Sequence, residues 1–200
     1  MSMKVELRYS HALEQLASLL SSAYEGDIED FIRKLEEVWS RVCDKAASII
    51  KSMTGVELGE QVVYVVSSLP SRASLEPMAI RACEDLAEAL DSLVYVLTVR
   101  ALRENRDLSD RISLLSAASG LSPLIFEKCI SMYVRFKIIE EAYGFLEAER
   151  VKRSVAKLSR GDKLSVRLYE LARKRAKSDS PEDFLDAIVG VVVSGYLNDY

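Results

Sequence analysis

The segment Ser122 to Gly144, SPLIFEKCISMYVRFKIIEEAYG, reads as one long helix on which the rest of the chain can be arranged. Ser122 can accept a hydrogen bond from a free backbone N–H of the first turn, Pro123 suits the first helical position, and Gly144 can end the helix in a left-handed conformation. One face of this helix is apolar and is expected to be core or subunit interface: Ile125, Cys129, Met132, Phe136 and Ile139.

The composition favours a helical protein around that segment. The chain has 200 residues, of which 49% are hydrophobic, with only 8 glycines and 4 prolines. This is enough apolar material for a sizeable core. Apolar residues recur at three- and four-residue spacing, without the alternation typical of strands. The sequence therefore predicts an all-α fold, a helical bundle.

Residue types argue against several classes of site. With a single histidine, His11, the chain has no basis for a histidine zinc site or a Ser-His-acid triad. Neither of the glycine-rich phosphate-binding patterns occurs. The three widely spaced cysteines lie on apolar helix faces and are expected to be reduced core thiols. We expect no metal and no cofactor.

Hydropathy and amide content bear on location and habitat. No run of about 18 apolar residues could span a membrane, and residues 1–20 are too charged for a signal peptide. We therefore expect a cytoplasmic protein that does not bind membranes. Asn and Gln together number four, whereas 29% of residues are charged. This usage resembles that of thermophilic, archaeal-like proteins.

The first domain, residues 1–69, is expected to be an N-terminal helical hairpin plus a short helix. Apolar spacing predicts helices over residues 3–24 and 28–53, with a break at Gly26. The valine-rich stretch 57–69 is compatible with a buried strand, but a helix is favoured because no partner strand is evident. A small polar segment with a proline, residues 67–71, then marks the domain boundary.

Two further regions follow this boundary. Residues 70–160 are expected to form a four-helix core, with helices over 75–104, 107–118, 122–144 and 147–158. Residues 161–200 are expected to add a basic helix and then an apolar terminal helix that begins near Ser180-Pro181.

Basic residues gather between residues 150 and 177. The whole chain has a formal charge of −4, yet this segment holds eleven Lys and Arg residues and only two acids. Four of the cations fall at helical spacing and could present one row to phosphates: Arg160, Lys163, Arg167 and Lys174. The alternative is a solvated face that pairs with the acidic remainder of the fold or of a partner. Only Tyr169 could stack on a base in this segment, which argues against single-strand recognition.

Residues 75–158 resemble the HEPN superfamily, and most closely its HepT-like toxin branch, whose members are partners of minimal nucleotidyltransferases. Four stretches carry the resemblance. The first is a long helix ending in ALRENRD, and the second is DRISLLSAASGLSPLIFEKCISMYVRF, which resembles the family's short helix, its Gly and Ser-Pro turn and its third helix. The third is RFKIIEEAY, at the position of the family's Arg-x4-His-x-Tyr signature, and the fourth is FLEAERVKRSVAKL, which resembles the closing helix. Arg135 matches the signature arginine. Glu140 stands in place of its histidine, and Tyr143 comes one residue late.

The resemblance implies a family in which the arginine and histidine cleave RNA without a metal at a dimer interface. A glutamate cannot supply a cationic imidazole as general acid. Our leading hypothesis is therefore a non-catalytic, toxin–antitoxin-like interaction protein. It would be a homodimer through helices 75–104 and 122–144 and would partner a nucleotidyltransferase-type protein.

Other interpretations remain open at the level of sequence. The main alternative is an RNA-binding protein or metal-independent ribonuclease that holds phosphates with the basic segment and places Arg135 and Glu140 at its site. A third is a structural scaffold whose N-terminal hairpin and apolar C-terminal helix bind a partner as helix-in-groove elements. The structural interpretation of Arg135 is a helix-end ion pair with Glu140 or Glu141.

Overall fold

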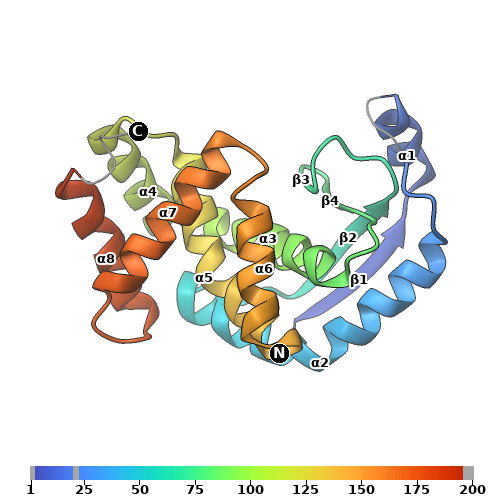
Figure 1. Ribbon diagram of the computed structural model, residues 1–200, viewed down its shortest axis with the longest axis horizontal. Helices are drawn as coiled ribbons and strands as arrows, with labels where there is room; N and C mark the ends of the chain where they lie inside the picture. Colours follow the sequence, from blue (N-terminus) through green and yellow to red (C-terminus); the bar gives the residue numbers. More distant parts are fainter. Residues whose placement is uncertain (1–2, 20–22, 196–200) are drawn as a thin grey trace.

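The computed structural model describes residues 3–19 and 23–195. Within that part, the elements follow one another in this order: β1 (Lys4–Tyr9), α1 (His11–Ser18), α2 (Ile28–Thr54), β2 (Glu60–Val66), β3 (Ala73–Leu75), β4 (Met78–Arg81), α3 (Leu86–Glu104), α4 (Arg106–Ser119), α5 (Pro123–Tyr143), α6 (Phe145–Val155), α7 (Arg160–Arg175) and α8 (Pro181–Val193). The strands lie at one end of the molecule, α4, α7 and α8 lie at the other, and α2 extends from the first end towards the second (Figure 1).

The four strands form one mixed sheet in the order β1-β2-β4-β3. β1 is parallel to β2, with Lys4 opposite Glu60, and β2 is parallel to β4, with Val66 opposite Arg81. β3 is antiparallel to β4. The three parallel strands therefore end at the same edge of the sheet.

This sheet shows that the predicted all-α fold is wrong. β2 occupies the valine-rich run, whose β-branched side chains fit a pleated surface better than a helix. The strand alternative for residues 57–69 is therefore correct, and the helix expected there is wrong. Its neighbours come from two stretches that were expected to be helical. In β1, KVELRY, charged and apolar residues alternate, which is the period of a strand.

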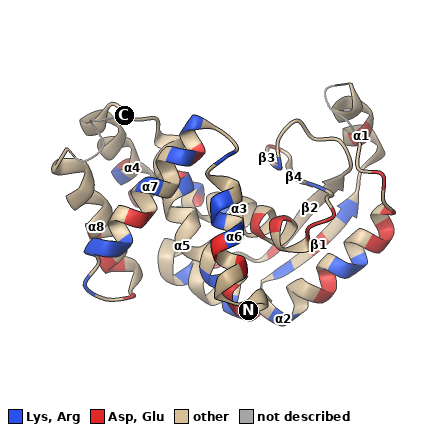
Figure 2. Ribbon diagram, viewed as in Figure 1, with Lys and Arg blue, Asp and Glu red and all other residues tan. Residues whose placement is uncertain are grey.

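The predicted N-terminal helical hairpin is wrong for the same reason. After β1, the helix α1 has only eight residues and contacts β2. Residues 20–22 of the expected first helix lie outside the described part of the chain. The second helix is confirmed as α2, which Asp27 caps and which ends at Gly55 with a left-handed φ of 69°. Charged residues lie along the outer side of α2, and its apolar residues pack into the core (Figure 2).

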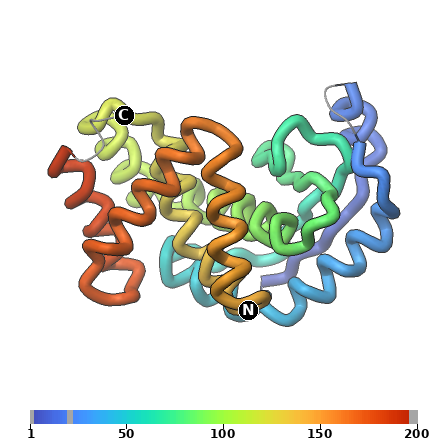
Figure 3. Tube along the Cα trace, viewed as in Figure 1, coloured from blue at the N-terminus to red at the C-terminus, as the bar shows by residue number. Residues whose placement is uncertain are grey.

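The long helix expected over residues 75–104 begins only at Leu86, because the residues before it form β4. The helix predicted over residues 122–144 is confirmed as α5, with the Ser122 hydroxyl accepting from the Leu124 N–H at 3.3 Å. α5 packs against α3 and is contacted by α2, α4, α6 and α7. Figure 3 shows α6, α7 and α8 following one another away from the sheet, with α5 beside them.

One hydrophobic core runs through both halves of the molecule. It joins Val63 and Ile80 of the sheet to Leu35 of α2, Leu97 of α3 and Ile130 of α5. The sheet itself takes strands from both sides of Leu69, where the sequence predicted a domain boundary. The three cysteines are free thiols, and Cys129 is buried.

Candidate functional site

Arg135 lies on the buried side of α5 and not at a helix end. Its guanidinium forms a two-point ion pair with Asp91 of α3, with Nε 2.8 Å from Oδ1 and Nη2 bound to Oδ2. Both side chains are almost inaccessible to solvent, at 7% and 1% exposure. Burial lowers the pKa of Arg135, but the interactions with acidic neighbours, Asp91 first among them, raise it more, so the net shift is upward. The predicted pairing with Glu140 or Glu141 is wrong.

The other two signature positions do not join Arg135. Glu140 is exposed, and so is Glu141 beside it. Tyr143 lies eight residues beyond Arg135, which is about 12 Å along a helix. Its hydroxyl is buried without a hydrogen-bond partner among the described residues, and burial raises its pKa. The structure therefore does not gather Arg135, Glu140 and Tyr143 into one site.

Asp91 is the residue that sequence reasoning missed. A signal was present, because it is the one charged residue in the apolar run ALDSLVYVLTV from Ala89 to Val99. An isolated carboxylate on an otherwise apolar helix needs a buried partner. The partner could not be chosen from the sequence because it depends on how α3 and α5 cross.

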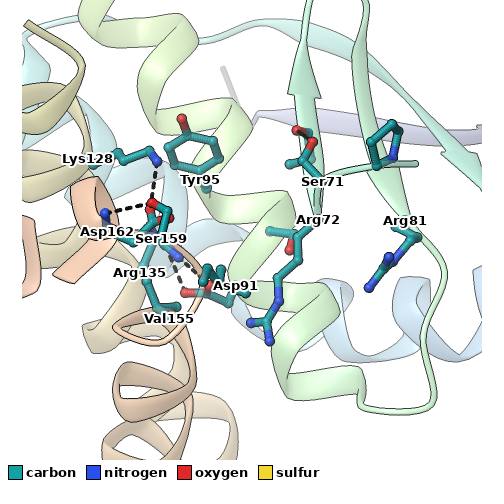
Figure 4. A pocket seen from close by; sticks show the side chains of 14 residues that line it. Ser71, Arg72, Arg81, Asp91, Tyr95, Lys128, Arg135, Val155, Ser159 and Asp162 are labelled. Carbon is teal, nitrogen blue, oxygen red and sulfur yellow. Dashed lines mark hydrogen bonds and ion pairs between the residues drawn. The ribbon is translucent and has the colours of Figure 1, made fainter. Parts of the chain in front are cut away.

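Arg135 and Asp91 line a pocket of about 480 Å³ between the sheet and the helices. The walls come from the segment before β3, the end of β4, α3, α5 and the connection between α6 and α7 (Figure 4). The side chains that line it are Pro70, Ser71, Arg72, Ala73, Arg81, Asp91, Ser92, Tyr95, Lys128, Arg135, Val155, Leu158, Ser159 and Asp162. Four of them are cations and two are carboxylates, so the lining carries an excess of two positive charges.

Both carboxylates of this pocket are occupied by cations of the helices. Asp91 holds Arg135, whose guanidinium carbon lies 5.2 Å from the centre of the Tyr95 ring. Asp162 accepts from Lys128 Nζ at 2.6 Å and from the Ser159 hydroxyl at 2.5 Å. The remaining two cations, Arg72 and Arg81, belong to the sheet side of the pocket.

A second hollow, which we call the α6–α7 groove, lies beside the first and has a volume of about 780 Å³. Its lining consists of Lys152, Arg153, Ala156, Lys157, Ser159, Arg160, Lys163, Leu164, Val166, Arg167 and Glu170. Six of these residues are cations and one is an acid. Ser159 lines both the groove and the pocket, so the two hollows meet at the connection between α6 and α7.

Three of the four cations that the sequence placed in one row line this groove. Arg160, Lys163 and Arg167 do so at spacings of three and four residues along α7. Lys174 does not line it. Figure 2 shows basic residues at several positions along α6 and α7.

Ion pairs divide the basic segment into two sets. Arg150 pairs with Glu147 of α6 and with Asp85 before α3, and Arg173 pairs with Asp179. In the groove itself, Lys152 lies 2.7 Å from Glu149 and 3.4 Å from Glu170. Part of the segment therefore serves the fold, as the alternative interpretation expected. The lysines at 157 and 163 are exposed, and no ion pair within the described chain includes them.

Comparison with protein-family models, curated proteins and solved structures gave no match to this chain. Within residues 3–19 and 23–195, no cluster of three or more His, Cys, Asp and Glu side chains could hold a metal ion. None of the described helices combines the length and the apolar character that a membrane crossing requires.

Proposed function

We propose that this protein binds RNA through the α6–α7 groove and does not cleave it. The observation that carries the proposal is the groove lining, with six cations against one carboxylate. A groove with this balance attracts a phosphate backbone, because each neutralised phosphate releases condensed counterions. RNA is chosen over DNA on the family resemblance described above.

The kind of contact expected follows from the side chains. No aromatic residue lines the groove, so bases have no ring on which to stack. The contacts should therefore be to phosphates and should carry little sequence information. A structured RNA such as a hairpin suits this surface better than an unpaired strand.

Binding without cleavage is supported by the state of the signature residues. Arg135 is engaged by Asp91 and buried, and Glu140 is exposed on another face of α5. The only imidazole, His11, belongs to α1, far from α7 (Figure 1). The groove lining therefore has no imidazole, the group that the family signature uses as general acid.

The test is a titration of a labelled RNA hairpin followed by fluorescence anisotropy at several salt concentrations. About four phosphate contacts would make log K fall with log salt at a slope of about −3 to −4. The double variant Lys157→Glu/Lys163→Glu should weaken binding at least tenfold and reduce that slope. Its matched control is Lys174→Glu/Lys177→Glu, which makes the same change of net charge in the basic segment outside the groove.

Two outcomes would overturn the proposal. One is no retention of the hairpin even at low salt. The other is an equal loss of affinity in the groove variant and in its control, because that would indicate a response to net charge alone. Cleavage of the hairpin by purified protein would contradict the non-catalytic part.

The homodimer, the nucleotidyltransferase-type partner and the cytoplasmic location stay predictions. The apolar residues of α3 and α5, which were expected to form the dimer interface, pack inside the monomer. A dimer would therefore need other surfaces, such as the exposed Phe145 and Leu146 at the start of α6. Light scattering at micromolar concentration tests this point, with a stable monomer contradicting it.

A further inference from the structure

The pocket is lined on its sheet side by Arg72, which pairs with Glu88, and by Arg81. Arg81 is the last residue of β4, and its Nη1 donates to the Leu69 carbonyl at 3.3 Å. No ion pair within the described chain includes Arg81. A half-buried guanidinium with only a carbonyl partner is a strong site for an anion.

Arg72 adds unused hydrogen-bonding capacity on the same wall. Its Nη2 binds Glu88 at 2.8 Å and the Ser154 hydroxyl at 3.0 Å. Its Nη1 is buried and has no hydrogen-bond partner among the described residues. A buried donor without a partner costs free energy that an acceptor from a ligand would recover. Phosphate oxygens suit it, because a guanidinium binds them through parallel hydrogen bonds.

The position of the pocket in the fold is also one that ligands use. Arg72 follows β2 by six residues, and Arg81 ends β4, so both lie near the carboxyl ends of parallel strands. Ligands of open sheets with parallel strands bind outside these ends. In Figure 4, Asp91 lies beside Arg72, the guanidinium of Arg81 lies on the other side of Arg72, and Ser159 and Lys128 lie further across the pocket.

The pocket offers more than an anion site. Its volume of about 480 Å³ lies within the range of small-molecule sites. Tyr95, Val155 and Leu158 give it an aromatic and apolar side. A ligand that fits has a compact, doubly charged head and a flat or apolar body of nucleoside size.

We infer that this pocket binds a phosphate monoester of nucleoside size, with its phosphate between Arg72 and Arg81 and Lys128 at the opposite wall. The phosphate could belong to a free mononucleotide or to the phosphorylated end of an RNA strand. The second source would require the strand to pass from the α6–α7 groove to the pocket at Ser159, which lines both.

Isothermal titration calorimetry with adenosine 5′-monophosphate, adenosine and inorganic phosphate tests the chemistry. We expect the monophosphate to bind at least tenfold more tightly than adenosine, and Arg81→Gln to remove that difference. The matched control is Arg106→Gln, which removes an exposed arginine of α4 outside the pocket. Because Arg81 has no ion pair to lose, the folded state should tolerate its replacement, which circular dichroism checks.

Two hairpins that differ only in a 5′-phosphate or a 5′-hydroxyl distinguish the two sources. A strand end as ligand predicts tighter binding of the phosphorylated hairpin and no such gain in Arg81→Gln. A free nucleotide as ligand predicts equal binding of both hairpins together with tight binding of the monophosphate. The inference is overturned if neither the monophosphate nor the 5′-phosphate binds better than its unphosphorylated counterpart, or if Arg106→Gln loses as much as Arg81→Gln. Binding of the 5′-hydroxyl hairpin through the groove would survive that failure, so this test is independent of the RNA proposal.

Discussion

The ion pair between Arg135 and Asp91 gives the sharpest prediction about stability. Arg135→Met keeps an apolar stem of similar length but leaves the Asp91 carboxylate buried with no cation. Two unit charges about 4 Å apart interact by about 4 kcal/mol at an effective dielectric constant of about 20. Removing one member of a buried pair typically costs about 3–5 kcal/mol. We expect a loss in this range from a total stability of about 5–15 kcal/mol.

Unfolding by guanidinium chloride, followed by circular dichroism, measures this loss of stability. With a slope of about 4 kcal/mol per molar denaturant, a loss of about 4 kcal/mol lowers the midpoint by about 1 M. The double variant Arg135→Met/Asp91→Leu should recover most of it, because no charge is then left buried. The control is Arg100→Met on α3, which breaks the exposed pair with Glu104 and should cost less than about 1 kcal/mol.

Two results would refute the reasoning. If Arg135→Met costs less than about 1 kcal/mol, the pair is not as buried or as well formed as the structure has it. If the double variant loses as much as the two single variants together, the two side chains act independently.

Two further predictions concern side chains whose hydrogen bonds connect one secondary-structure element to another. Burial raises the pKa of Glu14, but hydrogen bonds from Ser67 and Ser68 at the end of β2 lower it more, so its net pKa lies below the ordinary 4.5. The stabilisation by Glu14 is therefore fully present above pH 4.5 and is lost as the pH falls through the lowered pKa. Urea titrations should show that Glu14→Gln is less stable than the parent protein at pH 7 and that this difference vanishes in acid. A difference in stability that does not depend on pH would contradict this prediction. The side-chain oxygen of Asn105 caps α4 by accepting from the Leu108 N–H, and its side-chain NH₂ group donates to the Thr54 backbone carbonyl at 2.7 Å. Asn105→Ala should lower the free energy of unfolding by about 1–2 kcal/mol in thermal denaturation, and an unchanged midpoint would show that the cap contributes nothing.

Helices with explicit ends could be predicted from the sequence. The helix α5 begins after Ser122 with Pro123 and ends before Gly144, and α2 begins after Asp27 and ends before Gly55, as their capping residues predicted. Such signals are local, because the capping side chain and the backbone group it binds are a few residues apart. The cationic groove was partly predictable on the same ground, since Arg160, Lys163 and Arg167 share a face of one helix.

The sheet and the pocket depended on contacts between distant segments. A β-branched run such as β2 is ambiguous until a partner strand is known, and β1 pairs with it across more than fifty residues. β4, with four residues, is too short to give a clear alternation. The pocket could not be foreseen because Arg72, Arg81, Asp91 and Lys128 come from separate elements.

The pairing of β1 with β2 also sets an order of events during synthesis. Lys4 of β1 pairs with Glu60 of β2, so β1 leaves the ribosome about 56 residues ahead of the strand that it binds. At about 5–20 residues per second this is a delay of roughly 3–11 s, which is long compared with the microseconds in which α2 can form. During that delay the backbone N–H and C=O groups of β1 have no neighbour in the sheet. Until β2 is made, β1 is open to wrong pairing and to chaperones, and in the finished sheet it is an edge strand.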